Sequence, residues 1–248
     1  MKFSANLGFL WKDRPLPDAI HAAKAAGFHA VECHWPYDTP ARDVRAALDA
    51  TGLPMLGLNT SRGDVGAGEN GLAALPGRTQ DAQAAIDQAI AYADTVQAGA
   101  IHVMSGFASG PAAHATFAEN LRYACAATGR TILIEPLNRH DAPGYFLQTT
   151  DQARAILNEV AAPNLRLMFD CYHVGRTEGD ILTRLSDLSD IIGHIQFASV
   201  PDRGAPDHGE LDYATIFEAL GDWPHPLGAE YKPIGDTDAT LGWMQRFG

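Results

Sequence analysis

The chain has 248 residues, 46% of them hydrophobic, and a formal net charge of −12 at pH 7. This length suits one α/β barrel or two small domains, and the acidic balance argues against a nucleic-acid binder, which needs a basic face. The cysteines Cys33, Cys125 and Cys171 are sparse and contain no C-x-x-C pair, which predicts a reduced, cytoplasmic protein without a zinc ribbon. No run of 18 apolar residues is present, so no membrane span is expected.

The predicted elements alternate between strand and helix along the whole chain. Apolar runs predict strands at residues 2–7, 30–33, 55–58, 101–104, 131–134, 165–170, 191–196 and 227–230. Helical periodicity and stop signals predict helices at residues 17–27, 40–51, 79–98, 111–128, 151–160, 178–189, 213–220 and 238–246. Thr149 or Thr150 is expected to cap the fifth of these helices.

Eight strand–helix units in about 250 residues predict a single (β/α)8 TIM barrel domain over residues 1–248. A doubly wound open sheet is the alternative, but it needs a G-x-G-x-x-G turn after an early strand, and none follows the first strand. Two long loops interrupt the alternation. Residues 60–77 contain five glycines and lack periodicity, and residues 198–210 carry Arg203, Asp207 and His208. Such loops in a compact domain are usually functional or disordered, and whether these two close over a ligand is left open.

Four strands in the second half of the chain end on an oxygen-bearing side chain. These residues are Glu135, Asp170, Gln196 and Glu230. Because barrel active sites form at the carboxyl ends of the strands, we expect the four to converge. Three carboxylates and an amide suit Mg²⁺ or Mn²⁺ better than zinc. Singly, each acid could instead pair with an arginine or cap the following helix.

Two of these residues, Glu135 and Glu230, lie on strands that could face each other across the site. Paired carboxylates near a metal can transfer protons on opposite sides of a bound carbon. A metal that chelates a carbonyl and a neighbouring hydroxyl stabilises the enediolate formed when the α-proton leaves. The pattern therefore indicates proton-transfer chemistry at a metal.

Other polar residues near these strand ends are candidates for substrate binding. His173 follows Asp170 by three residues and could bind a substrate hydroxyl or support a metal ligand, or be an ordinary loop histidine. Lys232 should point to the same side as Glu230 and could bind a substrate carboxylate or neutralise that glutamate. Arg203 is a second candidate for the carboxylate, or a solvated loop arginine. The full candidate set is His173, Lys232, Arg203, Asn59 and His102, although the strand position of His102 favours a core or supporting role.

The sequence resembles the hydroxypyruvate isomerase family, within the xylose isomerase-like TIM barrels, over essentially its whole length. The motifs that carry the resemblance are FSANL at 3–7, IEPLN at 134–138, D-x-YH at 170–173, GHIQ at 193–196, GELDY at 209–213 and EYKP at 230–233. The resemblance implies metal ligation by Glu135, Asp170, Gln196 and Glu230. It also implies that Glu135 and Glu230 are the proton donor/acceptor pair, and that the protein is a homo-oligomer.

Some loop residues depart from the family pattern. Ser199 stands where an aspartate is usual, Asp207–His208 replaces a Gly–Thr pair, and Thr60–Ser61–Arg62 is unusual after the third strand. None of these is a predicted ligand. They lie on loops that would shape the substrate pocket, so they bear on the substrate rather than on the chemistry.

We therefore predict a cytoplasmic, metal-dependent isomerase of a small hydroxy-oxo acid. The favoured reaction converts hydroxypyruvate to 2-hydroxy-3-oxopropanoate (tartronate semialdehyde) through a cis-enediolate. A 2-oxotetronate isomerase and a ketose 3-epimerase are alternatives on the same site. An endonuclease IV-like phosphodiesterase is disfavoured. It would need several metal-binding histidines and a basic groove, whereas the strand ends here carry acids and an amide and the net charge is −12. A non-catalytic sugar-acid binding protein is the alternative from another class.

Overall fold

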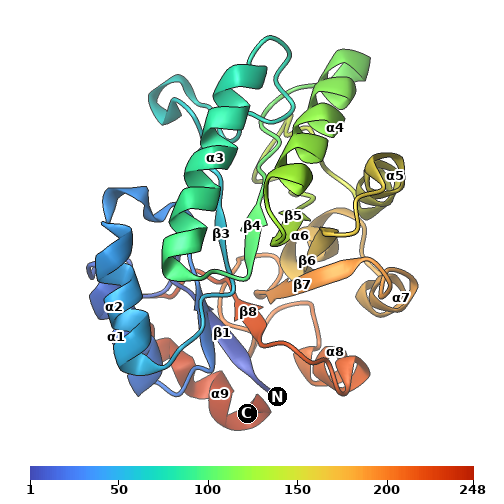
Figure 1. Ribbon diagram of the computed structural model, residues 1–248. Helices are drawn as coiled ribbons and strands as arrows, with labels where there is room; N and C mark the ends of the chain where they lie inside the picture. Colours follow the sequence, from blue (N-terminus) through green and yellow to red (C-terminus); the bar gives the residue numbers. More distant parts are fainter.

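The computed structural model describes all 248 residues, and its strands form one sheet of eight parallel strands (Figure 1). The strands are β1 (Phe3–Asn6), β2 (Ala30–Glu32), β3 (Gly57–Asn59), β4 (Ala100–His102), β5 (Thr131–Ile134), β6 (Leu165–Asp170), β7 (Ile192–Phe197) and β8 (Leu227–Ala229). Their hydrogen-bonded order is β2-β1-β8-β7-β6-β5-β4-β3. Sequential strands are thus neighbours, and the first strand pairs with the last.

The two outer strands of this order, β2 and β3, meet and close the sheet. Val31 forms a parallel bridge with Met55. The Val31 N–H donates to the Pro54 carbonyl at 3.0 Å, and the Leu56 N–H donates to the Val31 carbonyl at 2.8 Å. The sheet is therefore a nearly closed barrel, and the predicted (β/α)8 fold is confirmed.

Helices surround the strands (Figure 1). The α-helices are α1 (Leu16–Ala25), α2 (Ala41–Thr51), α3 (Thr79–Val96), α4 (Gly110–Ala127), α5 (Thr150–Val160), α6 (Cys171–Thr177), α7 (Ile181–Asp187), α8 (Tyr213–Leu220) and α9 (Met244–Phe247). Short 3-10 helices are η1 (Pro36–Asp38), η2 (Val65–Ala67) and η3 (Thr237–Trp243). Thr149 is the N-cap of α5, since its hydroxyl accepts from the Gln152 N–H at 3.2 Å, as predicted.

Two helical segments differ from the prediction. The chain passes from β6 directly into α6, because the Asp170 carboxylate accepts from the Tyr172 N–H at 2.7 Å and caps the new helix. The helix expected at 178–189 is consequently shorter, and begins at Ile181 after Gly179, whose φ is +70°. The helix expected at 238–246 is mostly the 3-10 helix η3.

An aromatic cluster joins the two ends of the chain. Phe3 in β1 lies 4.9 Å from Trp243 in η3 and 5.8 Å from Phe197 in β7, measured between ring centroids. Phe217 in α8 packs on Phe197 at 5.2 Å. Such edge-to-face pairs add to the stabilisation from burial. The cluster fixes β1 beside β7 and β8, which brings the first strand to the site formed by the last four.

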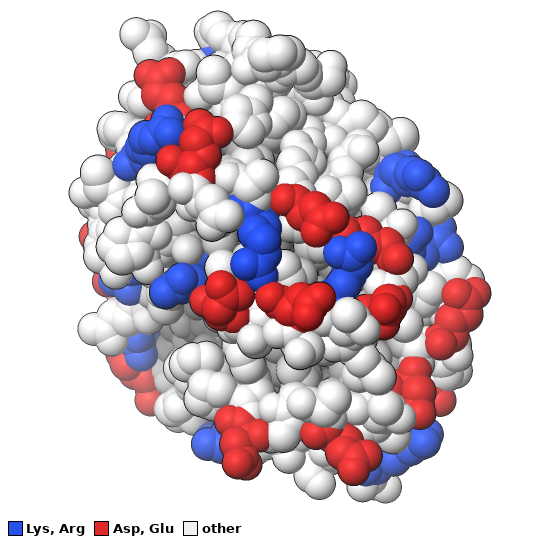
Figure 2. All heavy atoms as spheres, turned by 90° about the vertical axis from the view of Figure 1, so that its right-hand side faces the viewer, with Lys and Arg blue, Asp and Glu red and all other residues white.

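The surface charges are intermixed. Figure 2 shows acidic and basic side chains next to one another on one face of the molecule. Two of the ion pairs link the consecutive helices α4 and α5, since Glu159 in α5 pairs with both His114 and Arg122 of α4, the latter at 3.2 Å. This face offers no continuous basic surface for a phosphate backbone. No helix of the structure is long and apolar enough to cross a membrane.

Candidate active site and metal centre

The predicted ligands lie together at the carboxyl ends of β5 to β8. Glu135 and Glu230 each follow the last residue of a strand, while Asp170 ends β6 and Gln196 lies near the end of β7. Asp170 and Gln196 are paired in register between these neighbouring strands. All four side chains are buried, with residue exposures of 5% or less. Burying so many polar groups is costly unless they have partners, so the site calls for a compensating charge.

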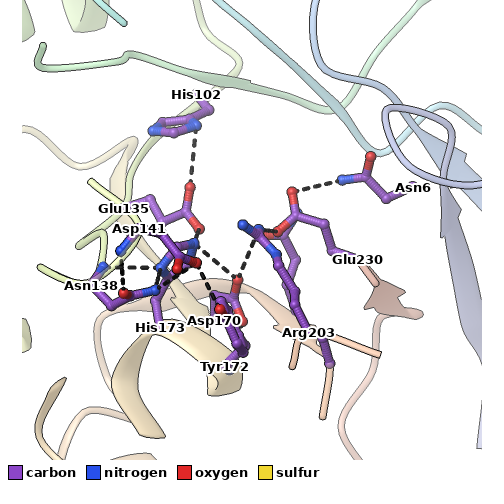
Figure 3. A network of polar contacts seen from close by, with 12 residues as sticks. Asn6, His102, Glu135, Asn138, Asp141, Asp170, Tyr172, His173, Arg203 and Glu230 are labelled. Atoms are coloured by element: carbon purple, nitrogen blue, oxygen red, sulfur yellow. Dashed lines mark hydrogen bonds and ion pairs between the residues drawn. The ribbon is translucent and has the colours of Figure 1, made fainter. Parts of the chain in front are cut away.

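Three carboxylates and a histidine form a tight cluster (Figure 3). Glu135, Asp170, Glu230 and His173 each offer one possible ligand atom, and these atoms all lie within 4.8 Å of one another. The His173 Nε2 lies 3.6 Å from Asp170 Oδ2 and 3.9 Å from Glu135 Oε1. The structure therefore contains a buried group of acidic and histidine side chains that could hold a metal ion.

Three of the four predicted ligands each keep one buried oxygen without a hydrogen-bond partner. These atoms are Glu135 Oε1, Asp170 Oδ2 and Gln196 Oε1. Buried polar atoms are nearly always paired, and an unpaired one costs about 1–3 kcal/mol or more if charged. A hard divalent cation takes oxygen ligands of these kinds, so the residues present fit such an ion.

His173 faces the cluster as a hydrogen-bond donor rather than as a ligand. The Asn138 backbone N–H donates to His173 Nδ1 at 2.9 Å. A neutral imidazole that accepts at Nδ1 carries its proton on Nε2, which points towards the carboxylates. A protonated Nε2 has no lone pair for a metal, so in this tautomer His173 is not a ligand and the predicted set of four oxygen residues stays a prediction.

Arg203 reaches into the cluster from the loop after β7. Its guanidinium donates to Glu230 Oε2 at 2.7 Å and lies 3.8 Å from Asp170 Oδ2. The guanidinium carbon is 4.7 Å from the Phe9 ring centre and 4.9 Å from the Tyr172 ring centre. These two rings contact the guanidinium and help to fix its position. Arg203 supplies positive charge to a site that has three carboxylates (Figure 3).

The turn that presents Arg203 contains two of the three departures from the expected pattern, Ser199 and His208. The Ser199 hydroxyl bonds to Asp202 and accepts from the Gly204 N–H at 3.2 Å. His208 Nε2 lies 2.9 Å from Asp202 Oδ2 and 3.3 Å from the Ser199 hydroxyl. The two departures therefore contact each other and share one aspartate, on a turn where Arg203 adopts a φ of +57°.

The carboxylates differ in their protonation equilibria. Burial and the charges of Glu230 and Asp170 raise the pKa of Glu135 well above its usual value, and burial together with Glu230 raises that of Asp170. Burial also opposes ionisation of Glu230, but Arg203 and His34 outweigh it and hold the Glu230 pKa below its usual value. Ionising all three carboxylates together is thus unfavourable without further positive charge, which a divalent cation would supply.

Several site residues on the first two strands were not among the predicted candidates. Asn6, at the end of β1, donates to Glu230 Oε1 and to Glu32 Oε1, both at 3.1 Å. His34 Nε2 lies 2.7 Å from Glu230 Oε1. Glu32, at the end of β2, accepts from Gln196 Nε2 at 2.7 Å. Asn6 and Glu32 are polar strand-end residues like the four predicted ligands. This shared position is the sequence signal that could have identified them as candidates.

The remaining substrate-binding candidates have different positions. His102 is buried, its Nδ1 lies 3.6 Å from Glu135 Oε2, and burial lowers its pKa to about 3, so it faces the cluster in its neutral form. Asn59 is half-buried at the end of β3, and its carbonyl accepts from the Tyr37 hydroxyl at 2.5 Å. Lys232 is exposed and makes no ion pair with Glu230. The structure thus brings His173, Arg203 and His102 to the cluster, and leaves Lys232 at the surface.

The long loop at 60–77 is attached to the loop that follows β4. Gly71 forms an antiparallel bridge with Ser105. Gly71 has a φ of +113°, and a Cβ there would come within 2.7 Å of the Gly106 nitrogen. Glycine is thus required at this contact. The bridge holds this loop against the loop that follows β4, at the carboxyl end of that strand.

A cavity of about 180 Å³ lies inside the barrel, on the amino-terminal side of the cluster. Small residues such as Gly57, Ala100 and Gly193 line it where larger side chains usually fill a barrel. Gln196, His102, Asn6 and Glu32 line it as well, so the cavity borders the residues that surround the cluster.

The family that matches residues 20–247 is the xylose isomerase-like TIM barrel. The chain belongs to this family. It is 44% identical to the 2-oxo-tetronate isomerase of Cupriavidus necator, over 99% of this chain and 98% of that protein. It is 35% identical to the hydroxypyruvate isomerase of Escherichia coli, over 100% of this chain and 99% of that protein.

A solved structure from Brucella melitensis, named AP endonuclease, family 2, superposes with a TM-score of 0.94 at 36% identity. The match covers 99% of this chain and 98% of that one. The resemblance expected from the motifs is confirmed. Both curated relatives are named isomerases, which confirms the predicted enzyme class at the level of the family.

Proposed function

We propose that this protein is a metal-dependent isomerase of a small hydroxy-oxo acid, with hydroxypyruvate as the first candidate substrate. The observation that carries the proposal is the set of buried, unpaired oxygens on Glu135, Asp170 and Gln196. They lie at the strand ends where barrel enzymes place their active sites. The isomerase names of the full-length relatives support the reaction class.

The residues that would hold the cation are Glu135, Asp170, Gln196 and Glu230. All four offer oxygen, which favours Mg²⁺ or Mn²⁺ over zinc. When bound, such a cation would stabilise the negative charge that develops on two neighbouring substrate oxygens as a proton leaves. It would also compensate the charges of the three buried carboxylates.

The two glutamates would move the proton between neighbouring carbons. For hydroxypyruvate, one glutamate takes a proton from C3, next to the C2 carbonyl, and the electron pair forms the C2–C3 double bond of an enediolate. The other glutamate returns a proton at C2, the hydroxyl proton passes from the C3 oxygen to the C2 oxygen, and the product is tartronate semialdehyde. The Glu135 Oε1 has no hydrogen-bond partner and is available for such a transfer.

His173 and Arg203 would orient the substrate. The Nε2–H of His173 points into the cluster and can donate to a substrate oxygen. The Arg203 guanidinium can bind the substrate carboxylate in the bidentate manner that suits it. The exposed position of Lys232 gives that residue less support for the same role.

A second candidate substrate is 2-oxo-tetronate, which is one carbon longer. The identity of 44% to a 2-oxo-tetronate isomerase favours it. The same proton transfer serves both acids, because each has a carbonyl beside a hydroxyl-bearing carbon. The endonuclease name of the Brucella protein raises nucleic acid as a ligand for that protein, but the net charge of −12 gives no support for it here.

We also propose a cytoplasmic location and a homo-oligomeric state. The location is supported by three free cysteines, of which Cys33 and Cys171 are buried, as suits a reducing compartment. The oligomeric state would be measured by light scattering of the purified protein. A monomeric mass at micromolar concentration would contradict it.

The reaction is tested with Glu135→Gln and Glu230→Gln, which keep the side-chain shape but remove the basic oxygen. Each should lower kcat for the hydroxy-oxo acid by about 10²-fold or more. The control is Glu159→Gln, an exposed helix residue paired with Arg122 and His114, which should leave kcat unchanged. Near-full activity in both variants would contradict the proposed chemistry.

A further inference from the structure

Glu32 is buried at the end of β2 and contacts Gln196, one of the four predicted metal ligands. Its carboxylate is 3% exposed and accepts from Asn6 Nδ2 at 3.1 Å and Gln196 Nε2 at 2.7 Å. His194 Nε2 lies 2.7 Å from its second oxygen. Three nitrogen donors thus converge on one buried acid, which is not part of the cluster itself.

The contact with Glu32 decides which way the Gln196 amide points. A carboxylate can only accept, so it holds the NH₂ end of the amide and turns the oxygen away. That oxygen, Gln196 Oε1, is buried and has no hydrogen-bond partner. Reversing the amide would place two oxygens against each other at the Glu32 contact and leave a buried NH₂ group where the unpartnered oxygen now lies.

Packing alone does not hold Gln196 in this orientation. The residue lines the internal cavity of about 180 Å³, together with Gly193 and Ala100, so space for reorientation lies beside it. The hydrogen bond to Glu32 is therefore the interaction that distinguishes the two orientations. The Asn6 amide joins this arrangement to Glu230, since it donates to both glutamates.

We propose that Glu32 is a positioning residue that presents the carbonyl oxygen of Gln196 to the metal. This inference rests on the proposed metal site. It predicts that the charge of Glu32 matters for metal affinity although the carboxylate itself does not ligate. Groups that orient metal ligands commonly change affinity about 10–100-fold when they are replaced.

The test is calorimetric titration of Mn²⁺ into chelator-stripped protein. Glu32→Gln should weaken the Mn²⁺ affinity about tenfold or more, because an amide at position 32 no longer selects one orientation of Gln196. The double variant Glu32→Gln/Gln196→Glu should recover most of that affinity. In this double variant, the NH₂ group of residue 32 donates to one oxygen of residue 196, and the other oxygen remains available to the metal. The total charge of the two side chains is the same as in the unmodified protein.

The matched control is Glu178→Gln. Glu178 is a half-buried glutamate whose side chain is 6% exposed, and it binds Arg184 and Thr150 away from the cluster. The Glu178→Gln substitution should lower the melting temperature without changing the affinity for Mn²⁺. If Glu32→Gln does not fold, Glu32→Asp replaces it, since the shorter side chain withdraws from Gln196 and should weaken Mn²⁺ binding in the same way.

The outcomes separate this inference from the proposed function. The positioning role would be overturned if the unmodified protein and Glu32→Gln bound Mn²⁺ with equal affinity. It would also be overturned if the double variant bound Mn²⁺ no more tightly than Glu32→Gln. Either result would leave the proposed metal site intact. No Mn²⁺ binding by the unmodified protein would overturn both.

Discussion

Arg203 should stabilise the metal-free site, and Arg203→Gln measures how much. Its side chain is 12% exposed and lies 2.7 Å from Glu230 Oε2, among three buried carboxylates. Removing one partner of a buried ion pair costs about 3–5 kcal/mol, because the other charge is left uncompensated. At the lower end, about 3 kcal/mol, the melting temperature of a chain of this size should fall by roughly 6–12 °C.

Thermal unfolding in the presence of a chelator measures this loss. Arg154→Gln is the matched control, since Arg154 pairs with Asp190 at 3.1 Å on the surface, and exposed pairs contribute about 0–1 kcal/mol. Saturating Mn²⁺ should then raise the melting temperature of Arg203→Gln by more than it raises that of the unmodified protein, because the cation replaces the missing guanidinium charge.

The reasoning would be refuted if Arg203→Gln and Arg154→Gln shifted the melting temperature equally in chelator. The reasoning would also be contradicted if Mn²⁺ raised the melting temperature of Arg203→Gln by less than it raises that of the unmodified protein. That result would show that Arg203 assists metal binding, whereas the reasoning has its charge take the place of the metal.

Other predictions concern the ligands, the loop after β7 and the core. Asp170→Asn should weaken Mn²⁺ binding at least tenfold by calorimetry, and an unchanged affinity would remove Asp170 from the ligand set. Asp207 and Asp202 raise the pKa of His208 in the folded protein. Protonated His208 therefore stabilises the fold fully below its unfolded-state pKa of about 6.5. This stabilisation is lost as the pH rises through the folded-state pKa. His208→Asn should therefore lower the melting temperature more at pH 5.5 than at pH 9, and an equal loss at both would contradict the ion pairs. Phe197→Ala should lose about 3–5 kcal/mol in denaturant unfolding, because the ring is fully buried in the aromatic cluster.

The fold could be predicted because its information is local. Each strand is a short apolar run, and most helices follow with their own stop signals. The sequence pattern does not predict α6, because Asp170 is at once a strand-end acid and the cap of a helix that starts directly after the strand. Such a direct junction is not visible in hydrophobic periodicity.

The site could be predicted in part. The positions of Glu135, Asp170, Gln196 and Glu230 at strand ends predicted that they lie at one end of the barrel, because parallel strands in a barrel bring their carboxyl ends together. Lys232 was expected beside Glu230 on the assumption of an extended chain, but β8 ends at Ala229, so the alternation of side chains does not continue.

The contacts of Asn6 and Glu32 could not be predicted from local sequence. They depend on barrel closure, which brings β1 and β2 to residues about 160–220 positions away. Within any one segment these residues are single polar side chains at the end of a short strand. Their contacts with Glu230 and Gln196 form only when the barrel closes and the first strand pairs with the last.

The most direct test of the proposed function is proton NMR of hydroxypyruvate in D₂O with purified protein, with Mn²⁺ or Mg²⁺ and again with chelator. The proposal predicts tartronate semialdehyde only when metal is present, with deuterium at C2 wherever the transferred proton exchanges with solvent. Metal-dependent deuterium exchange into hydroxypyruvate without product would keep the enediolate chemistry and move the substrate to the longer acid. If neither turnover nor exchange is observed with hydroxypyruvate, and neither is observed with 2-oxo-tetronate, the proposed isomerase is contradicted.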